Sequence, residues 1–155
     1  DVATIVTIMA ALHRHYRQPD PDRTALRRMV TRCLAADGRL GRIVLCFDGA
    51  EAIGLVTYGL AVPGPDFKPV MMIKDLFVLP DHRNAGCGAF IMRHLARICL
   101  EADISRLDLT TESWNEGAMR FYERLNGSLQ EQKRAYRFVG QSLQNLAAAK
   151  SHQSA

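Results

Sequence analysis

The fold of this chain is decided by residues 70–100, which read VMMIKDLFVLPDHRNAGCGAFIMRHLARICL. The first part, 70–79, is almost wholly apolar and predicts a buried strand. That strand ends at Pro80, and a glycine-containing turn then opens an amphipathic helix over 86–102. A strand that runs through a glycine turn into a helix leaves unpaired backbone N–H groups at the positive end of the helix dipole. Such groups bind phosphate.

Two common nucleotide-binding motifs do not fit this turn. A dinucleotide fingerprint requires a third glycine where Ile91 stands, and a phosphate-binding loop requires a Gly-Lys-Ser/Thr run that is absent. A helix that merely begins at a glycine, without any ligand, remains the alternative interpretation.

The rest of the chain alternates between helical and strand-like patterns, and a turn at Asp48-Gly49 predicts a hairpin. Further helices are expected over 2–17, from a cap at Asp22 or Thr24 to Asp37, over 116–125, and in a polar tail after 139. Further strands are expected over 42–47, 52–60, 106–111 and 136–139. The apolar stripe of the second helix is expected to be Leu26, Met29, Val30, Cys33 and Leu34. This order predicts a mixed α/β sheet with helices on both faces.

Length and composition indicate one globular domain over 1–155, since the chain has 155 residues of which 48% are hydrophobic. No apolar run approaches the roughly 18 residues of a membrane helix, and no secretory leader opens the chain, so we expect a cytoplasmic protein with no membrane partner. The four cysteines form no C-x-x-C pair, which favours free thiols in a reducing compartment and no metal site. The net charge of +4 favours an anionic partner without naming one.

Two motifs resemble those of the GNAT family of N-acetyltransferases. The coenzyme A motif of that family, [Gln/Arg]-x-x-Gly-x-[Gly/Ala] after a strand ending in Val-x-Pro, is matched by Val78-Leu-Pro80 and Arg83-x-x-Gly86-x-Gly88. The family's Asn-x-x-Ala-x-x-Phe-Tyr block is matched by Asn115, Ala118, Phe121 and Tyr122. The sequence is most similar to the diamine (spermidine/spermine) acetyltransferase branch, through the runs 75–83, 114–116 and 136–138.

The resemblance implies an α/β (α+β) GNAT fold. Its sheet would be mixed, mostly antiparallel and twisted, with helices on both faces and a splayed central strand pair. The family opens with a strand before its first helix, whereas this chain begins at Asp1 in helical sequence, so that strand is expected to be missing.

The same resemblance implies an N-acetyltransferase that uses acetyl-CoA as co-substrate, without a metal, and transfers acetyl directly to a primary amine of a small molecule. Backbone N–H groups of the turn would wrap the diphosphate, Arg83 would add a positive charge, and the strand before the turn would bond the pantetheine. The residues implied to hold acetyl-CoA are Leu76, Phe77, Val78, Arg83, Asn84, Ala85, Gly86, Cys87, Gly88, Ala89, Asn115 and Tyr122.

Tyr122 is the candidate general acid, because a phenol near a developing thiolate can donate its proton. Its alternative role is that of a core aromatic beside Phe121.

Asp75 is the candidate general base, acting directly or through a water, because an unpaired charge inside an apolar strand is costly. It could instead hold a cationic substrate or form a structural ion pair with Lys74 or an arginine. The diamine branch carries a glutamate where Lys74 stands, and strand alternation is expected to turn Lys74 away from Asp75. Asp108, Glu112 and Glu116 are the alternative carboxylates.

Three further side chains are expected near the acceptor. Trp114 is expected to pack at a strand end or to stack on substrate. His13 and His15 lie two residues apart on a helix and so share no face, which argues against a metal site and favours solvated side chains.

Other functions remain as alternatives. Between His13 and Arg42 stand eight arginines against three aspartates, which fits a solvated helix face but also an acetyltransferase toxin that modifies charged tRNA. A peptide or protein N-acetyltransferase and a non-catalytic acyl-CoA-binding module are the others, and the presence of Asn115 and Tyr122 argues against the module. Nucleic acid is not expected as a partner, and a homodimer is possible.

Overall fold

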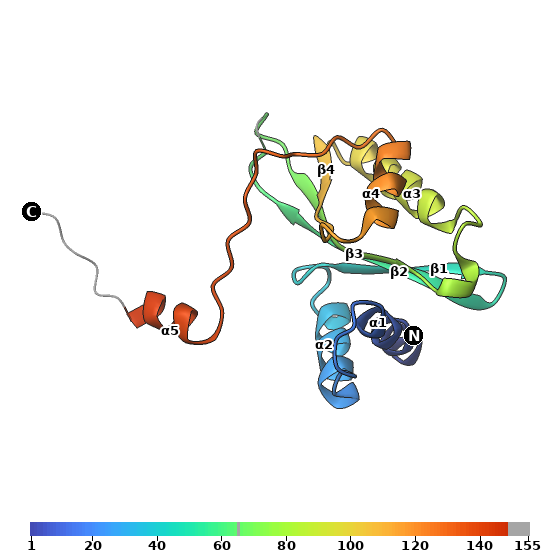
Figure 1. The fold of residues 1–155 in the computed structure, drawn as a ribbon, viewed down its shortest axis with the longest axis horizontal. Helices are drawn as coiled ribbons and strands as arrows, with labels where there is room; N and C mark the ends of the chain where they lie inside the picture. Colours follow the sequence, from blue (N-terminus) through green and yellow to red (C-terminus); the bar gives the residue numbers. More distant parts are fainter. Residues whose placement is uncertain (65, 149–155) are drawn as a thin grey trace, which may run out of the picture. The chain divides into compact units, whose positions relative to one another are not determined.

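A computed structural model describes residues 1–64 and 66–148 of the chain (Figure 1). Its backbone contacts divide the chain into two compact units, Asp1–Glu116 and Gly117–Ala155. In the described residues, no helix is both long enough and apolar enough to cross a membrane.

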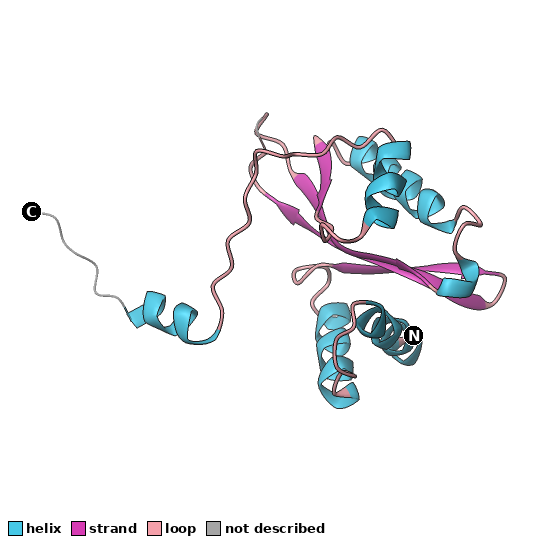
Figure 2. Ribbon diagram, viewed as in Figure 1, coloured by secondary structure: helices cyan, strands magenta, loops and turns pink. Residues whose placement is uncertain are grey.

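The first unit is built on a four-stranded sheet in the order β1-β2-β3-β4 (Figure 2). The strands are β1 (Arg42–Asp48), β2 (Glu51–Ala61), β3 (Val70–Val78) and β4 (Arg106–Leu109). Neighbours β1, β2 and β3 are antiparallel, whereas β3 and β4 are parallel. The sheet is therefore mixed and mostly antiparallel, as expected, although β4 ends before the predicted limit of 111.

Helices cover both faces of this sheet (Figure 1). On one face lie α1 (Val2–His15) and α2 (Arg23–Ala35), and on the other lies α3 (Cys87–Glu101). The carboxylate of Asp22 accepts a hydrogen bond from the Thr24 backbone N–H at 2.8 Å, so Asp22 rather than Thr24 is the cap that starts α2.

Each face has its own apolar core. The core under α3 includes Val56, Met71, Ile73, Ile91 and Leu95. The core under α1 and α2 includes Ile5, Ile8, Leu26, Val30, Leu55 and Phe77. Because neighbouring strand residues point to opposite faces, the two cores share the strands but not the side chains.

The predicted stripe of α2 is wider than the face that the helix buries. Leu26 and Val30 are buried, whereas Met29 and Leu34 are exposed. Because α2 packs through one side only, against α1 and β1, the other half of its apolar stripe faces outward.

The second unit contains most of α4 (Glu116–Arg124) and all of α5 (Gly140–Ala148). The structure assigns no strand over 136–139, so the expected last strand is wrong, and Tyr136 is 86% exposed. A strand exists only when its backbone pairs with a neighbour, and the alternating pattern of this segment cannot supply that neighbour. The helix predicted for the tail is present as α5, and residues 149–155 of that tail lie outside the described part.

Candidate active site

A β-bulge interrupts β3 beside the predicted catalytic carboxylate. Thr57 of β2 faces Asp75, and the next residue, Tyr58, faces Ile73, so that Lys74 has no opposite residue. One extra residue in a strand bends it and shifts its alternation by one position. The side chains of β3 that face α3 therefore come from odd-numbered residues before Lys74 and from even-numbered residues after it.

Burial along β3 records that shift. Before the bulge, Met71 and Ile73 pack into the core under α3, and after it Leu76 and Val78 pack against the same core. Phe77 consequently faces the α1 side, where it joins the other core. Asp75, two residues earlier on the same regular segment, faces that side as well.

Lys74 does not follow the expected alternation, because it is the extra residue of the bulge. Its Nζ lies 3.9 Å from the Asp75 Oδ1, although strict alternation would turn the two side chains apart. Lys74 is 84% exposed and Asp75 only 22% exposed in their side chains. The Lys74–Asp75 contact is therefore long and solvated on the lysine side, which makes it a weak ion pair.

The edge of β3 that faces β4 is paired only in part. Pairing runs from Val70–Arg106 to Ile73–Leu109 and stops there, although β3 continues to Val78. Among the described residues, the last segment of β3 thus pairs with β2 alone.

The direction of the backbone groups on that segment follows from one hydrogen bond. Leu79 N–H donates to the Ile53 carbonyl of β2 at 2.9 Å. Since successive residues of a strand point their N–H and C=O groups to opposite edges, those of Leu76 and Val78 point away from β2. The backbone groups of Phe77 point toward β2 instead. This disagrees with the expectation that Phe77 contributes a main-chain contact to pantetheine.

The glycine turn lies directly after this segment. A short 3₁₀ turn, Pro80–His82, leads to Asn84 and Gly86, both of which have positive φ, and Gly86 caps α3 without any side-chain hydrogen bond to the helix. No acidic side chain occupies the first turn of α3. The first N–H groups of a helix lack acceptors within it, so this end of α3 offers donors to an anion.

Gly86 is the position where the turn depends on glycine. Its φ is +87°, and a Cβ built there would meet nothing within 4 Å. The space above the backbone is therefore open. Glycine adopts this left-handed conformation at little cost, whereas a residue with a side chain would be strained in it. Open space, a left-handed cap and free helix donors are together the features that fit a diphosphate.

Arg83 is folded back onto β3. Its Nε donates to the Val78 carbonyl at 3.0 Å, and its guanidinium carbon lies 5.4 Å from the centre of the Phe77 ring. These two contacts hold the positive charge beside the strand that carries Asp75.

Asp75 is fixed by a hydrogen bond across the sheet. Thr57 Oγ1 donates to its Oδ2 at 3.0 Å, which leaves Oδ1 facing the exposed Lys74. Asp108, an alternative carboxylate, accepts from Arg106 Nε at 2.9 Å and is therefore already neutralised by a neighbour on its own strand.

Four rings gather on the face of the sheet that carries Asp75, and we call them the aromatic cluster: His15, Tyr16, Phe77 and Trp114. His15 lies 5.8 Å from Phe77 and 5.5 Å from Tyr16, and Tyr16 lies 6.1 Å from Trp114, all between ring centres. The end of α1, β3 and the segment after β4 thus converge here. Trp114 remains 58% exposed, so part of its surface is available to a ligand.

The cluster has a distinct electrostatic character. Burial, then the charges of Asp75 and Glu112, raise the pKa of Tyr16 above its usual value, so its hydroxyl keeps its proton at neutral pH. Burial, then the nearby Arg83, lower the pKa of His15, so its imidazole is neutral at pH 7. A neutral histidine and a protonated tyrosine therefore stand beside two carboxylates.

His15 is exposed, as expected of a solvated side chain, but its ring also contacts those of Phe77 and Tyr16. Tyr16 and Thr57 were missed altogether by the sequence analysis. Tyr16 lies at the end of an amphipathic helix, and only its three-dimensional distance from Asp75 and Trp114 distinguishes it from an ordinary surface tyrosine. In the part of the chain that the structure describes, no three His, Cys, Asp or Glu side chains group as metal ligands.

The remaining predicted residues lie beyond β4. Asn115 N–H donates to the Glu112 carbonyl at 2.9 Å, in the turn that leads to α4. Tyr122 lies in α4, half-buried, with its ring 5.1 Å from that of Phe121 in an edge arrangement. Its carbonyl accepts from the Leu125 and Gly127 N–H groups, which closes the helix at the glycine turn that follows.

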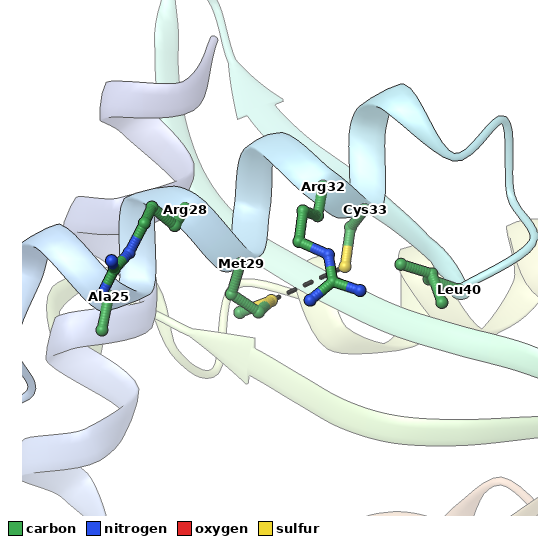
Figure 3. Close-up of a pocket in the computed structure, with 6 residues that line it drawn as sticks. All are labelled: Ala25, Arg28, Met29, Arg32, Cys33 and Leu40. Atoms are coloured by element: carbon green, nitrogen blue, oxygen red, sulfur yellow. Dashed lines mark hydrogen bonds between the residues drawn. The ribbon is translucent and has the colours of Figure 1, made fainter.

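A shallow hollow lies along the outward half of α2 (Figure 3). It is lined by Ala25, Arg28, Met29, Arg32, Cys33 and Leu40. It contains none of the predicted site residues.

Several known proteins are similar to this chain. A thialysine N-epsilon-acetyltransferase from Bos taurus is 32% identical over 78 residues, covering 48% of this chain and 46% of the bovine protein. An L-ornithine N5-acetyltransferase from Arabidopsis thaliana is 26% identical over 79 residues, covering 51% of this chain and 35% of the plant protein. The matched stretch therefore spans less than half the length of these two relatives.

Among solved structures, similarity extends over nearly the whole chain. An integron cassette protein from the mobile metagenome of V. cholerae superimposes with a TM-score of 0.80 and 29% identity, covering 94% of this chain and 91% of that one. The sequence profile described as the acetyltransferase (GNAT) family matches residues 5–127. Because that match covers most of its length, this chain belongs to the GNAT acetyltransferase family.

Proposed function

We propose that the protein is an acetyl-CoA-dependent N-acetyltransferase that moves an acetyl group to the primary amine of a small molecule by direct transfer. The observation that carries this proposal is the dual use of β3. After its bulge, one edge of the strand has no strand partner among the described residues and leads into the glycine turn, while one face holds Asp75 beside the aromatic cluster.

Acetyl-CoA fits the unpaired edge and the turn. The N–H groups of residues 84–89 would bind its diphosphate, and the open space over Gly86 lets an anion approach the backbone. The backbone groups of Leu76 and the N–H of Val78 would bond the pantetheine, since the Val78 carbonyl already accepts from Arg83. When bound, acetyl-CoA supplies an activated thioester carbonyl, and a backbone N–H from this edge would polarise its oxygen as in other oxyanion sites.

Asp75 would receive the proton of the acceptor amine. An ammonium has no free electron pair, so it must lose a proton before it can attack a carbonyl. The Thr57 hydroxyl fixes one oxygen of Asp75, and the other is left to accept a proton, directly or through a water. Lys74 stands in the position where the diamine branch has a glutamate, so that position offers no carboxylate for this role.

Tyr122 would return a proton to the departing thiolate. A phenol is a stronger acid than water and stays protonated near neutral pH, so it can donate when negative charge develops on sulfur. Its place in the Asn-x-x-Ala-x-x-Phe-Tyr block and its half-buried ring support this assignment.

The acceptor class is supported from two sides. The bovine and plant relatives are named for acetylation of a side-chain amine of a small amino acid. In this chain, Asp75, Glu112 and the exposed Trp114 present two carboxylates and an aromatic face, which suit a cationic amine. A peptide substrate or charged tRNA would instead need a surface that reaches well beyond this cluster.

A panel of acceptors tests this function. Purified protein is given acetyl-CoA together with thialysine, ornithine, spermidine, an amino-terminal peptide or charged tRNA, and the release of free thiol is followed. Turnover with one of the small amines is the expected result. Acetylation confined to the peptide or the tRNA would contradict the small-molecule acceptor, and no turnover with any of them would contradict transferase activity.

The role of Asp75 is tested by Asp75→Asn, with Asp108→Asn as the matched control. If Asp75 is the base, the substitution lowers kcat about 100-fold with little change in the acceptor KM, and the rate loses its lower pH limit. Asp108→Asn should leave the pH profile unchanged, since Arg106 already holds that carboxylate. A raised KM with wild-type kcat in Asp75→Asn would show substrate holding instead of proton transfer.

A further inference from the structure

Two buried cysteines meet where β1 lies against the start of α3. Cys46 of β1 and Cys87, the first residue of α3, have their Sγ atoms 3.1 Å apart. They are 8% and 9% exposed and belong to the core under α3. Their positions in the sequence are 41 residues apart, so the contact is a product of the fold.

The distance is short enough for a covalent bond to replace the contact. A disulfide has its sulfur atoms about 2.05 Å apart. Closing the gap therefore requires the two sulfur atoms to approach by only about 1 Å, a displacement within reach of small rotations of the two side chains and a slight movement of the helix end.

The other two cysteines have different surroundings. The sulfur of Cys99 lies 3.9 Å from the thioether sulfur of Met71, and that of Cys33 lies 3.6 Å from the thioether of Met29. A thioether cannot form a disulfide with a thiol. Of the four cysteines, all of which are described and free, only Cys46 and Cys87 have a thiol as their sulfur neighbour.

We propose that Cys46 and Cys87 are a modification site that a hydroperoxide converts to an intramolecular disulfide, and that the disulfide weakens coenzyme A binding at the glycine turn. The second half of this inference rests on the proposed function. The first half depends on the two sulfur atoms alone.

The reaction balances with one equivalent of hydroperoxide. One cysteine sulfur attacks the peroxide oxygen, which breaks the O–O bond, gives a sulfenic acid and releases water or an alcohol. The sulfur of the second cysteine then displaces the sulfenic hydroxyl, forms the S–S bond and releases water. The two thiols together lose two electrons and two protons, which the peroxide takes up.

The effect on binding follows from the place of Cys87. It directly follows Gly86, and its own N–H is among the donors at the start of α3. Moving Cys87 toward β1 shifts the neighbouring N–H groups away from the positions in which they converge on a diphosphate. By linkage, bound coenzyme A must oppose formation of the disulfide by the same factor.

Cys87 should react slowly with a peroxide. Burial, and then the neighbouring Cys46, raise the pKa of the Cys87 thiol to about 12, so almost none of it is thiolate at neutral pH. Because the thiolate is the nucleophile, the rate of oxidation should increase as the pH rises through the neutral range. This separates Cys87 from an activated redox cysteine, whose thiolate is already present at pH 7.

A peptide map tests the disulfide itself. The full-length protein is treated with hydrogen peroxide, denatured in an alkylating reagent and digested. We expect a peptide pair linking Cys46 to Cys87 with the loss of two hydrogens, and alkylated Cys99. The linked pair should form more slowly when coenzyme A is present during oxidation.

Calorimetry with coenzyme A tests the consequence. We expect the oxidised wild type to bind about 10-fold more weakly than the reduced protein and to recover fully with dithiothreitol. Cys46→Ala, which removes a thiol outside the predicted coenzyme site, should bind like the reduced wild type before and after peroxide. Cys99→Ala, a matched buried cysteine beside a thioether, should lose affinity on oxidation as the wild type does.

Each result decides one part of the inference. Absence of the 46–87 peptide after prolonged oxidation at alkaline pH overturns the modification site. The disulfide with unchanged coenzyme A affinity overturns the coupling, and so does a loss of affinity that persists in Cys46→Ala. A reduced protein that binds no coenzyme A contradicts the proposed function and the coupling with it, while the peptide map still judges the cysteine pair.

Discussion

The unpaired edge of β3 and the face of the same strand are built from different parts of the chain. The edge, with the glycine turn that follows it, is made of backbone groups from one continuous stretch, 76–89. The face that carries Asp75 is made of side chains from four separate segments, represented by Tyr16, Thr57, Asp75 and Trp114. The site at the edge of β3 depends on the backbone conformation, whereas the site on its face depends on which side chains the fold brings together.

This difference has a practical meaning for mutations. A backbone site tolerates most side-chain changes and fails when φ or ψ changes, whereas a side-chain site fails one interaction at a time. Substitutions at the two sites should therefore separate cleanly between coenzyme affinity and acceptor kinetics.

The largest effect is expected from Tyr122→Phe. This substitution tests whether acetyl transfer needs a side chain that belongs neither to the edge of β3 nor to the face that carries Asp75. The ring and its contact with Phe121 remain, but the donated proton is lost. Turnover should decrease about 100-fold or more while coenzyme A affinity stays unchanged. Tyr136→Phe, at an 86% exposed tyrosine, is the control. Wild-type turnover in Tyr122→Phe would make Tyr122 a packing residue.

A smaller effect is expected from Gly86→Val, which attacks the backbone site. Valine is strained at a φ of +87°, and its side chain would occupy the open space above the turn. We expect coenzyme A affinity, measured by calorimetry, to fall about 30-fold, corresponding to roughly 2 kcal/mol. Gly59→Val is the matched control, since a Cβ there also meets nothing but the backbone is ordinary strand. Equal affinity in both folded variants would remove the turn from the site.

The side-chain site should respond more weakly to Trp114→Ala. Loss of one aromatic face costs a cationic ligand about 0.5–1 kcal/mol, which predicts a rise of about 2–5-fold in the acceptor KM. Coenzyme A affinity should not change. Phe67→Ala, at a 90% exposed aromatic outside the cluster, serves as the reference variant. A change in coenzyme affinity without a change in acceptor KM would reverse the assignment of the two sites.

The smallest expected effect is that of Arg83→Gln on the pKa of His15. Arg83→Gln removes a charge that lowers the pKa of His15, so the pKa should rise toward 6.5 but stay below it, because burial is the larger cause. Since the unfolded state binds the proton more tightly than the folded one, stability falls as the pH decreases through 6.5, and this fall should be shallower in Arg83→Gln. Titration of the His15 ring by NMR measures the shift, and an unchanged midpoint would show that Arg83 does not act on His15.

The comparison also explains which parts of the molecule could be predicted from sequence. The glycine turn could be proposed as a binding site from sequence because glycine spacing, strand and helix lie in one stretch and leave a local pattern. Asp75 could be proposed as a site residue because a charge inside an apolar strand is conspicuous. Tyr16 and Thr57 were missed because their significance depends on distances across the fold, for which a single sequence carries no signal.

The errors in the fold have the same origin. Residues 136–139 have strand-like alternation but no strand partner in the described structure, and the exposed Met29 belongs to a helix stripe that is wider than its contact. Local pattern predicts what a segment is able to form, while pairing and packing depend on distant residues. The bulge at Lys74 was likewise invisible, since nothing in the sequence marks one residue of β3 as extra.

That bulge has a consequence for anyone who transplants or redesigns this strand. If Lys74 were drawn into regular pairing with β2, strict alternation would turn the following residues over, so that the carboxylate of Asp75 would enter the core beneath α3 and the Phe77 ring would leave its own core. Deleting Lys74 would leave both orientations unchanged, because Asp75 would then directly follow Ile73. A shift of one residue in the pairing would thus cost more than most changes of residue type. β3 therefore consists of two regular segments on either side of Lys74, and the segment that carries Asp75 keeps its orientation only while Lys74 stays outside the pairing.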